Sequence, residues 1–66
     1  MEVVLNGKCE PLKEGISLLE FLRFKGLNPE IILVEHNEKL VATNEWKFII
    51  LHDKDRLEVL NFVGGG

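Results

Sequence analysis

The residues with the clearest chemical potential are the last three, Gly64, Gly65 and Gly66, which follow directly on a β-prone segment. Residues without a Cβ atom form a thin and conformationally free arm. Such an arm fits a channel that is too narrow for any side chain, and its only reactive group is the α-carboxylate of Gly66. Because a free carboxylate is a poor electrophile, we expect a partner to activate it as an acyl adenylate with ATP and magnesium. Three glycines alone also fit a frayed chain end, so the elements before them decide between the two interpretations.

Other residues capable of chemistry are few, because the chain has one Ser, one Thr, one Cys, two His and no Tyr. His36 and His52 lack a neighbouring Cys pair and a second His one helical turn away, so no metal site is predicted. Cys9 fits the usual role of a free Cys as a small hydrophobe. Asp53 and Asp55 lack the downstream Gly and Glu of a calcium loop and fit a solvated turn. The chain has no phosphate-binding glycine loop, so we expect no bound cofactor and no enzymatic activity of its own.

Length and composition predict one small folded module. The chain has 66 residues, of which 45% are hydrophobic and 29% charged, a balance typical of globular proteins. The net charge of −3 comes without a cationic stripe, so nucleic acid is not expected as a partner. The sequence shows neither a signal-peptide pattern nor a long apolar run, and we expect no membrane contact. A single Cys cannot form an intramolecular disulfide, and small secreted domains usually depend on several, so a cytoplasmic protein is expected. We also expect the protein to be a monomer when it is alone.

The start of the chain predicts an antiparallel hairpin. Residues 1–6 alternate with a period of two, as in a strand with one buried face. Asn6-Gly7 is the dipeptide that favours a type I′ turn, so residues 8–12 should return as a second strand. Pro11 cannot donate a ladder hydrogen bond, which places this second strand at an edge of the sheet.

A short helix is predicted next. Ser17 and Glu20 have the spacing of a capping box, and Gly26 occupies the position at which a left-handed residue ends a helix. Pro29 prevents the helix from resuming. One face of the helix is apolar and can cover a sheet, and it carries Leu18, Phe21 and Leu22.

The second half predicts three strands, at residues 31–36, 40–41 and 56–63. Between the last two, Thr43 or Asn44 is expected to cap a single helical turn that places Trp46 in the core. This element order predicts an α+β fold, a β-grasp (ubiquitin-like) roll, in which one main helix covers a mixed sheet of four to five strands. The first and last strands should lie adjacent at the centre of this sheet. The expected organisation is a domain over residues 1–63 with a flexible glycine tail over residues 64–66.

Period-two alternation in the three central strands also places four apolar residues on the open face of the sheet: Val4, Leu33, Leu60 and Phe62. Together they would form an exposed patch beside the exit of the tail. Such a patch often marks a partner-binding surface, although single exposed apolar residues are normal.

Over its whole length the chain resembles the ThiS family, the small sulfur carrier proteins of thiamine biosynthesis. The segments that carry the resemblance are Val4-Leu5-Asn6-Gly7-Lys8, Ser17 to Leu22, Val34-Glu35-His36-Asn37-Glu38, Trp46, Asp53-Lys54-Asp55 and Phe62-Val63-Gly64-Gly65-Gly66. The ending and the overall length are the most specific parts. Gly65 and Gly66 match the family's diglycine.

The resemblance implies a carrier that other proteins act upon. An E1-like adenylyltransferase that uses ATP and magnesium would adenylate Gly66, and a sulfur-donating desulfurase system would supply sulfur for a thiocarboxylate. Thiazole synthase would then accept the sulfur. Open sheet faces serve E1-like partners in the ubiquitin superfamily, which agrees with the predicted patch. The alternatives are a sulfur carrier for another pathway, such as molybdopterin synthesis or tRNA thiolation, and a ubiquitin-like module that only binds non-covalently.

Overall fold

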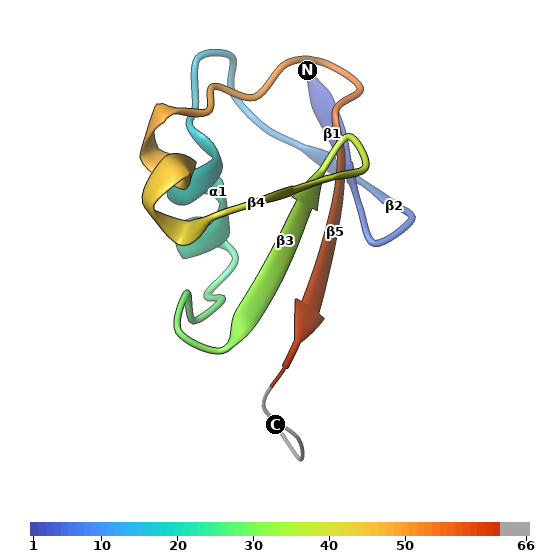
Figure 1. Ribbon diagram of the computed structural model, residues 1–66. Helices are drawn as coiled ribbons and strands as arrows, with labels where there is room; N and C mark the ends of the chain where they lie inside the picture. The colour runs from blue at the N-terminus through green and yellow to red at the C-terminus, as the bar shows by residue number, and fades with distance from the viewer. Residues whose placement is uncertain (63–66) are drawn as a thin grey trace.

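The fold is built on one five-stranded sheet, against which the helices pack (Figure 1). The computed structural model describes residues 1–62. Its elements are β1 (Glu2–Leu5), β2 (Lys8–Pro11), α1 (Leu18–Phe24), β3 (Ile32–His36), β4 (Lys39–Val41), the 3₁₀ helix η1 (Thr43–Phe48) and β5 (Arg56–Asn61). The strand order is β2-β1-β5-β3-β4, with β1 and β5 parallel and all other neighbours antiparallel. The predicted β-grasp fold is confirmed, with the first and last strands adjacent at the centre of the sheet.

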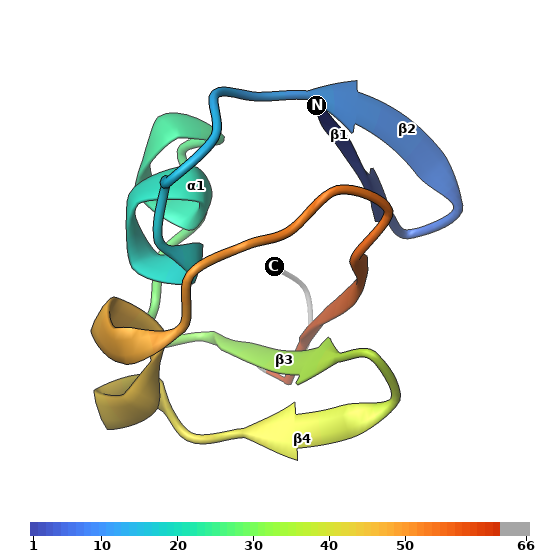
Figure 2. The same cartoon turned by 90° about the horizontal axis from the view of Figure 1, so that it is seen from above.

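The helices cover one face of this sheet and leave the other open. Figure 2 shows α1 and η1 together on one side, with the strands curving around them. The hydrophobic core between the two layers is formed by Val3, Leu18, Phe21, Leu22, Ile32, Val34, Val41, Trp46, Leu51 and Leu57. Within residues 1–62, no helix is long and apolar enough to cross a membrane.

Local sequence signals account for the hairpin and for both ends of α1. Asn6 and Gly7 have φ angles of 50° and 81°, the left-handed values that a type I′ turn requires. At the start of α1, the Glu20 backbone N–H donates to the Ser17 hydroxyl at 3.1 Å, and the Ser17 N–H donates to the Glu20 carboxylate at 3.0 Å. At its end, the Leu27 N–H donates to the carbonyl of Leu22 at 3.0 Å, which is the Schellman pattern. The predicted capping box, helix end and edge position of β2 are all confirmed.

The segment around Trp46 differs from its prediction. It forms a six-residue 3₁₀ helix with Ala42 at the N-cap position, and neither Thr43 nor Asn44 caps it. Because Ala42 has no polar side chain, the Glu45 carboxylate supplies the cap and accepts the Ala42 backbone N–H at 2.7 Å. Trp46 itself is 1% exposed, and its indole N–H donates to the carbonyl of Val41. The prediction of Trp46 as a core residue is confirmed.

Asp55 links the turn after β3 to the start of β5. It is 8% exposed, so the prediction of a solvated turn is wrong for this residue. Its carboxylate lies 2.8 Å from His36 Nε2 and accepts hydrogen bonds from the His52 backbone N–H at 2.9 Å and the Asn37 amide at 3.1 Å. Burial by itself would raise the pKa of Asp55, but the hydrogen bonds from these three residues outweigh it and lower the pKa below its ordinary value.

We expect Asp55→Asn to lower the free energy of unfolding at pH 7 by about 1–3 kcal/mol, because an amide cannot accept all the hydrogen bonds that the carboxylate accepts. A lowered pKa means that the ionised carboxylate stabilises the fold above about pH 4 and loses this effect as the pH falls through the folded-state pKa. The difference from wild type should therefore shrink at pH 3 in urea denaturation. Asp53→Asn is the control, because exposed Asp53 accepts only the Glu2 backbone N–H within residues 1–62. Equal losses for the two variants would contradict this assignment.

Candidate functional site

β5 carries the chain from the centre of the sheet towards its last residues (Figure 1). β1 pairs with β5 only as far as Leu57, and beyond that point the Asn6 side chain takes its place, bonding both backbone groups of Val59. On the other side β3 accompanies β5 to its end, and the Phe62 N–H donates to the carbonyl of Ile31 at 3.0 Å. The sheet therefore fixes the chain up to Phe62. The predicted site residues Gly64, Gly65 and Gly66 lie outside the described residues.

Three of the four predicted surface residues gather beside this end of β5. Leu33 and Leu60 are direct cross-strand partners, and Phe62 continues the same alternation two residues later. Their exposed fractions are 45%, 60% and 55%. We call these three residues the Leu60 patch.

Val4 does not join the Leu60 patch. It is only partly exposed and lies opposite Arg56, four residues before Leu60 on β5, which is a separation of about 13 Å along an extended strand. Alternation in the sequence correctly placed Val4 on the open face. Alternation does not specify the register between β1 and β5, and this register determines which residues of the two strands become neighbours.

Charged residues border the Leu60 patch on the same face, and sequence reasoning missed them. Glu35 lies directly opposite Glu58, two residues along each strand from the outward pair of Leu33 and Leu60. With Glu38 and Arg56 these residues line a shallow notch. The available signal was the outward position of both glutamates, but their opposition depends on the pairing of β3 with β5.

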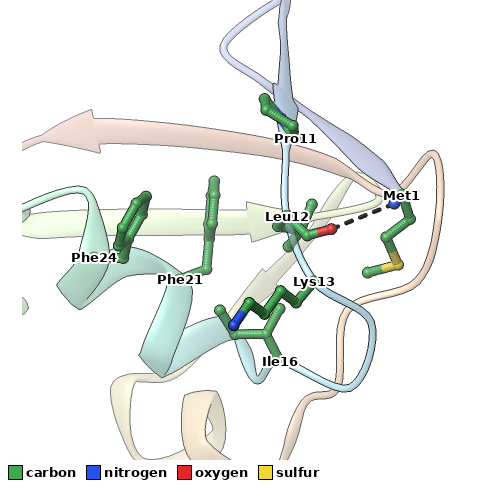
Figure 3. A pocket seen from close by; sticks show the side chains of 7 residues that line it. All are labelled: Met1, Pro11, Leu12, Lys13, Ile16, Phe21 and Phe24. Atoms are coloured by element: carbon green, nitrogen blue, oxygen red, sulfur yellow. Dashed lines mark hydrogen bonds between the residues drawn. The ribbon is translucent and has the colours of Figure 1, made fainter.

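A separate apolar pocket of about 590 Å³ lies between β2 and α1 (Figure 3). Its lining residues are Met1, Pro11, Leu12, Lys13, Ile16, Phe21 and Phe24. No pair of acid and base side chains faces it, and Lys13 is the single charged side chain in its lining. No sequence motif indicated this pocket, because it forms where the hairpin and the helix meet.

Reactive side chains are dispersed across the rest of the described fold. Cys9 is exposed on β2, and His36 is engaged with Asp55. Within residues 1–62, no three His, Cys, Asp or Glu side chains come together in a way that could hold a metal ion. The described residues therefore present an exposed apolar patch beside the end of β5, and their reactive side chains are not gathered into one site.

Comparisons with known proteins agree on one family. The model of the ThiS family matches residues 3–66. The sulfur carrier protein ThiS of Bacillus subtilis is 32% identical over 63 residues, which cover 94% of this chain and 96% of that protein. The crystal structure of a thiamine biosynthesis protein, ThiS, from Geobacter metallireducens covers both chains completely, with a TM-score of 0.84 and 29% identity. A thiazole synthase of Magnetococcus marinus is 33% identical over all 66 residues, but the chain spans only 20% of that relative's length.

Proposed function

The chain belongs to the ThiS family, and from this premise we propose that it is a sulfur carrier of thiamine biosynthesis and not a catalyst. In this role the carboxylate of Gly66 is the carrying group, and Gly64 and Gly65 lead it into the active centres of other proteins. An E1-like adenylyltransferase activates the carboxylate, and a desulfurase system provides the sulfur. The observation that carries the proposal is the family match itself, because it extends through the three terminal glycines.

The proposed chemistry has two steps. In the first, a carboxylate oxygen of Gly66 attacks the α-phosphorus of ATP, and pyrophosphate leaves with magnesium balancing its charge. In the second, a sulfur nucleophile attacks the acyl carbon, the C–S bond forms, and AMP leaves with the former carboxylate oxygen. When the sulfur arrives as a persulfide, a thiol supplies the two electrons that release the thiocarboxylate. ATP and magnesium belong to the activating partner in this scheme, since the sequence has no phosphate-binding loop.

The geometry of β5 supports docking of the activating enzyme on the open face. Phe62 is held on the sheet, and only four residues separate it from the end of Gly66. Four fully extended residues span at most about 14 Å, so the centre that activates Gly66 must lie within that distance of Phe62. An enzyme that reaches so close will cover the Leu60 patch, and burial of these apolar side chains stabilises the complex.

Thiazole synthase is the acceptor that we propose. Among the relatives, a protein named thiazole synthase contains a stretch similar to this entire chain within a fifth of its own length. Such a combination in one polypeptide suits two partners that exchange a group, because a covalent link raises their effective concentration.

The test is carrier-dependent exchange of labelled pyrophosphate into ATP by an E1-like adenylyltransferase of the ThiS pathway. This exchange reports the first step alone and needs no sulfur source. We expect exchange to require the full chain, ATP and magnesium together. Absence of exchange above the enzyme's own background, with the carrier folded, would contradict the proposed activation of Gly66.

A further inference from the structure

The edge of β5 that faces β1 runs on beyond the end of β1 (Figure 1). In this parallel ladder the Asn6 N–H donates to the carbonyl of Leu57 at 2.8 Å, and the Asn6 side chain then makes the next pair of bonds. Its amide oxygen accepts the Val59 N–H at 2.7 Å, and its amide nitrogen donates to the Val59 carbonyl at 3.2 Å. A primary amide has the donor and the acceptor of a peptide group, so Asn6 takes the place of one more residue of β1.

Asn61 is the next residue of β5 whose backbone groups point to this edge. The Phe62 N–H donates to Ile31 on the β3 side, and successive residues of a strand direct their N–H and C=O groups to alternate edges. Asn61 is exposed, and within residues 1–62 its backbone N–H and C=O have no hydrogen-bond partner. A strand edge with unpaired backbone groups is a template for pairing with another chain.

A groove of about 210 Å³ lies beside this unpaired edge. Three of its lining residues, Leu5, Leu27 and Val59, also pack against the core, which places the groove on the helix side of the sheet. Its charged side chain, Lys25, is paired with Glu10 at 2.9 Å, so the groove suits a neutral, apolar side chain. We call it the Asn61 groove, and its lining residues are Leu5, Asn6, Lys25, Leu27, Val59 and Asn61.

We propose that the activating enzyme adds an extended segment to this edge of β5, in line with β1, and places one apolar side chain of that segment in the Asn61 groove. The inference rests on the proposed function and names the contact by which the enzyme holds the strand that leads to Gly66. Asn61 directly precedes Phe62, and the reach of the last four residues, at most about 14 Å, brings the enzyme's centre close to both.

Strand addition fits both features of this edge. Main-chain hydrogen bonds to Asn61 supply affinity, and alternate side chains of an added strand point to opposite faces of the sheet. One of them therefore reaches the Asn61 groove on the helix side, and its neighbours reach the open face that carries the Leu60 patch. The enzyme segment thus fixes both the direction and the register of β5 at the point where the chain leaves the sheet.

Three substitutions at Asn61 separate the two parts of this contact. Asn61→Pro removes the outward N–H, and we expect it to raise the KM of the activating enzyme for the carrier about tenfold, because an acceptor on the enzyme loses its donor. Asn61→Trp keeps the N–H but narrows the Asn61 groove, and it should raise KM at least about fivefold. Asn61→Ala is the matched control, which keeps the N–H and an open groove and should leave KM within about twofold. Tm should change little in all three, since Pro is tolerated in a strand where its missing N–H faces outward.

Amide hydrogen exchange of the wild-type carrier tests the pairing directly. The isotopically labelled full chain would be saturated with the activating enzyme without ATP, which leaves Gly66 unmodified, and exchange would be measured residue by residue. We expect exchange at the Asn61 amide to be fast in the free carrier and at least about tenfold slower in the complex. The internal control is Cys9 on the edge strand β2. It lies opposite Val4, which directs its own N–H to β5, so the Cys9 amide points outward and should exchange equally fast in both states.

The outcomes separate this inference from the proposed function. If wild type supports pyrophosphate exchange but Asn61 is not slowed in the complex, or Asn61→Pro is no worse than Asn61→Ala, strand addition is overturned and the carrier chemistry stands. Slowing of Asn61 by thiazole synthase alone would overturn the assignment to the activating enzyme. If the wild-type chain supports no pyrophosphate exchange, both the proposed function and this inference fail.

Discussion

Deletion of Gly66 is expected to abolish carrier-dependent pyrophosphate exchange while leaving Tm unchanged. The deletion moves the terminal carboxylate back by about 3.5 Å, and a shift of about 1 Å in a reacting group already costs about 100-fold in rate. An alanine appended after Gly66 should be equally damaging, since it moves the carboxylate forward by one residue. Neither change touches the core, whose buried residues extend no further along the chain than Leu57.

The control for this prediction is Glu14→Ala, an exposed substitution in the loop before α1 that leaves the length of the chain after Phe62 unchanged. This variant should keep its exchange rate within a few-fold of wild type. A shortened chain that still supports full exchange would show that the position of the Gly66 carboxylate is irrelevant. Loss of the fold on deleting one terminal residue would show that the tail has a structural role.

The second large effect is expected from Leu60→Asp in the Leu60 patch. Leu60 lies between Leu33 and Phe62 on the open face, which is the position of a central anchor in an interface. Truncating such an anchor costs about 2–4 kcal/mol, and burying an unpaired carboxylate adds to the cost. We therefore expect kcat/KM for activation to fall by roughly 30- to 1000-fold. Because Leu60 is already 60% exposed, Tm should change little.

Phe48→Asp is the control for Leu60→Asp. Phe48 is 75% exposed, but it lies at the end of η1 on the helix side of the sheet. The substitution places the same carboxylate on an exposed apolar position away from the proposed interface, so activation should stay within a few-fold of wild type. Equal losses of activation in the two variants would show that the open face of the sheet does not bind the activating enzyme. Partner binding that depends on Leu60 but persists without any adenylation would favour the non-covalent binding module.

Much of the fold could be predicted because its signals are local. Asn6-Gly7 determines its turn through its own backbone preferences, and Ser17 with Glu20 satisfies the free N–H groups of the first turn of α1. Gly26 ends the helix for the same kind of reason. Once the hairpin and a single short helix are recognised, few arrangements bury the remaining apolar faces.

The candidate site could be predicted only in part, because its composition depends on pairing between distant segments. Alternation placed Leu33 and Leu60 on the open face, and their contact follows from the register of β3 against β5. The same register places Glu35 directly opposite Glu58, and no local sequence pattern predicts this pairing. Likewise, the parallel pairing of β1 with β5 separates Val4 from the patch. Burial of Asp55 is also partly non-local, because two of its three partners, His36 and Asn37, lie in the turn after β3, far from Asp55 in the sequence.

The central claim is that Gly66 carries sulfur, and mass spectrometry tests it most directly. The carrier would be incubated with the E1-like adenylyltransferase, ATP, magnesium and a sulfur source, then alkylated with a thiol-selective reagent and fragmented. Fragmentation is needed because oxidation of Met1 or Cys9 changes the mass almost as much as exchange of one oxygen for sulfur. We predict that the alkylated sulfur is found on Gly66. An unmodified carboxylate on Gly66, under conditions in which a known carrier of the family is converted, would contradict the account.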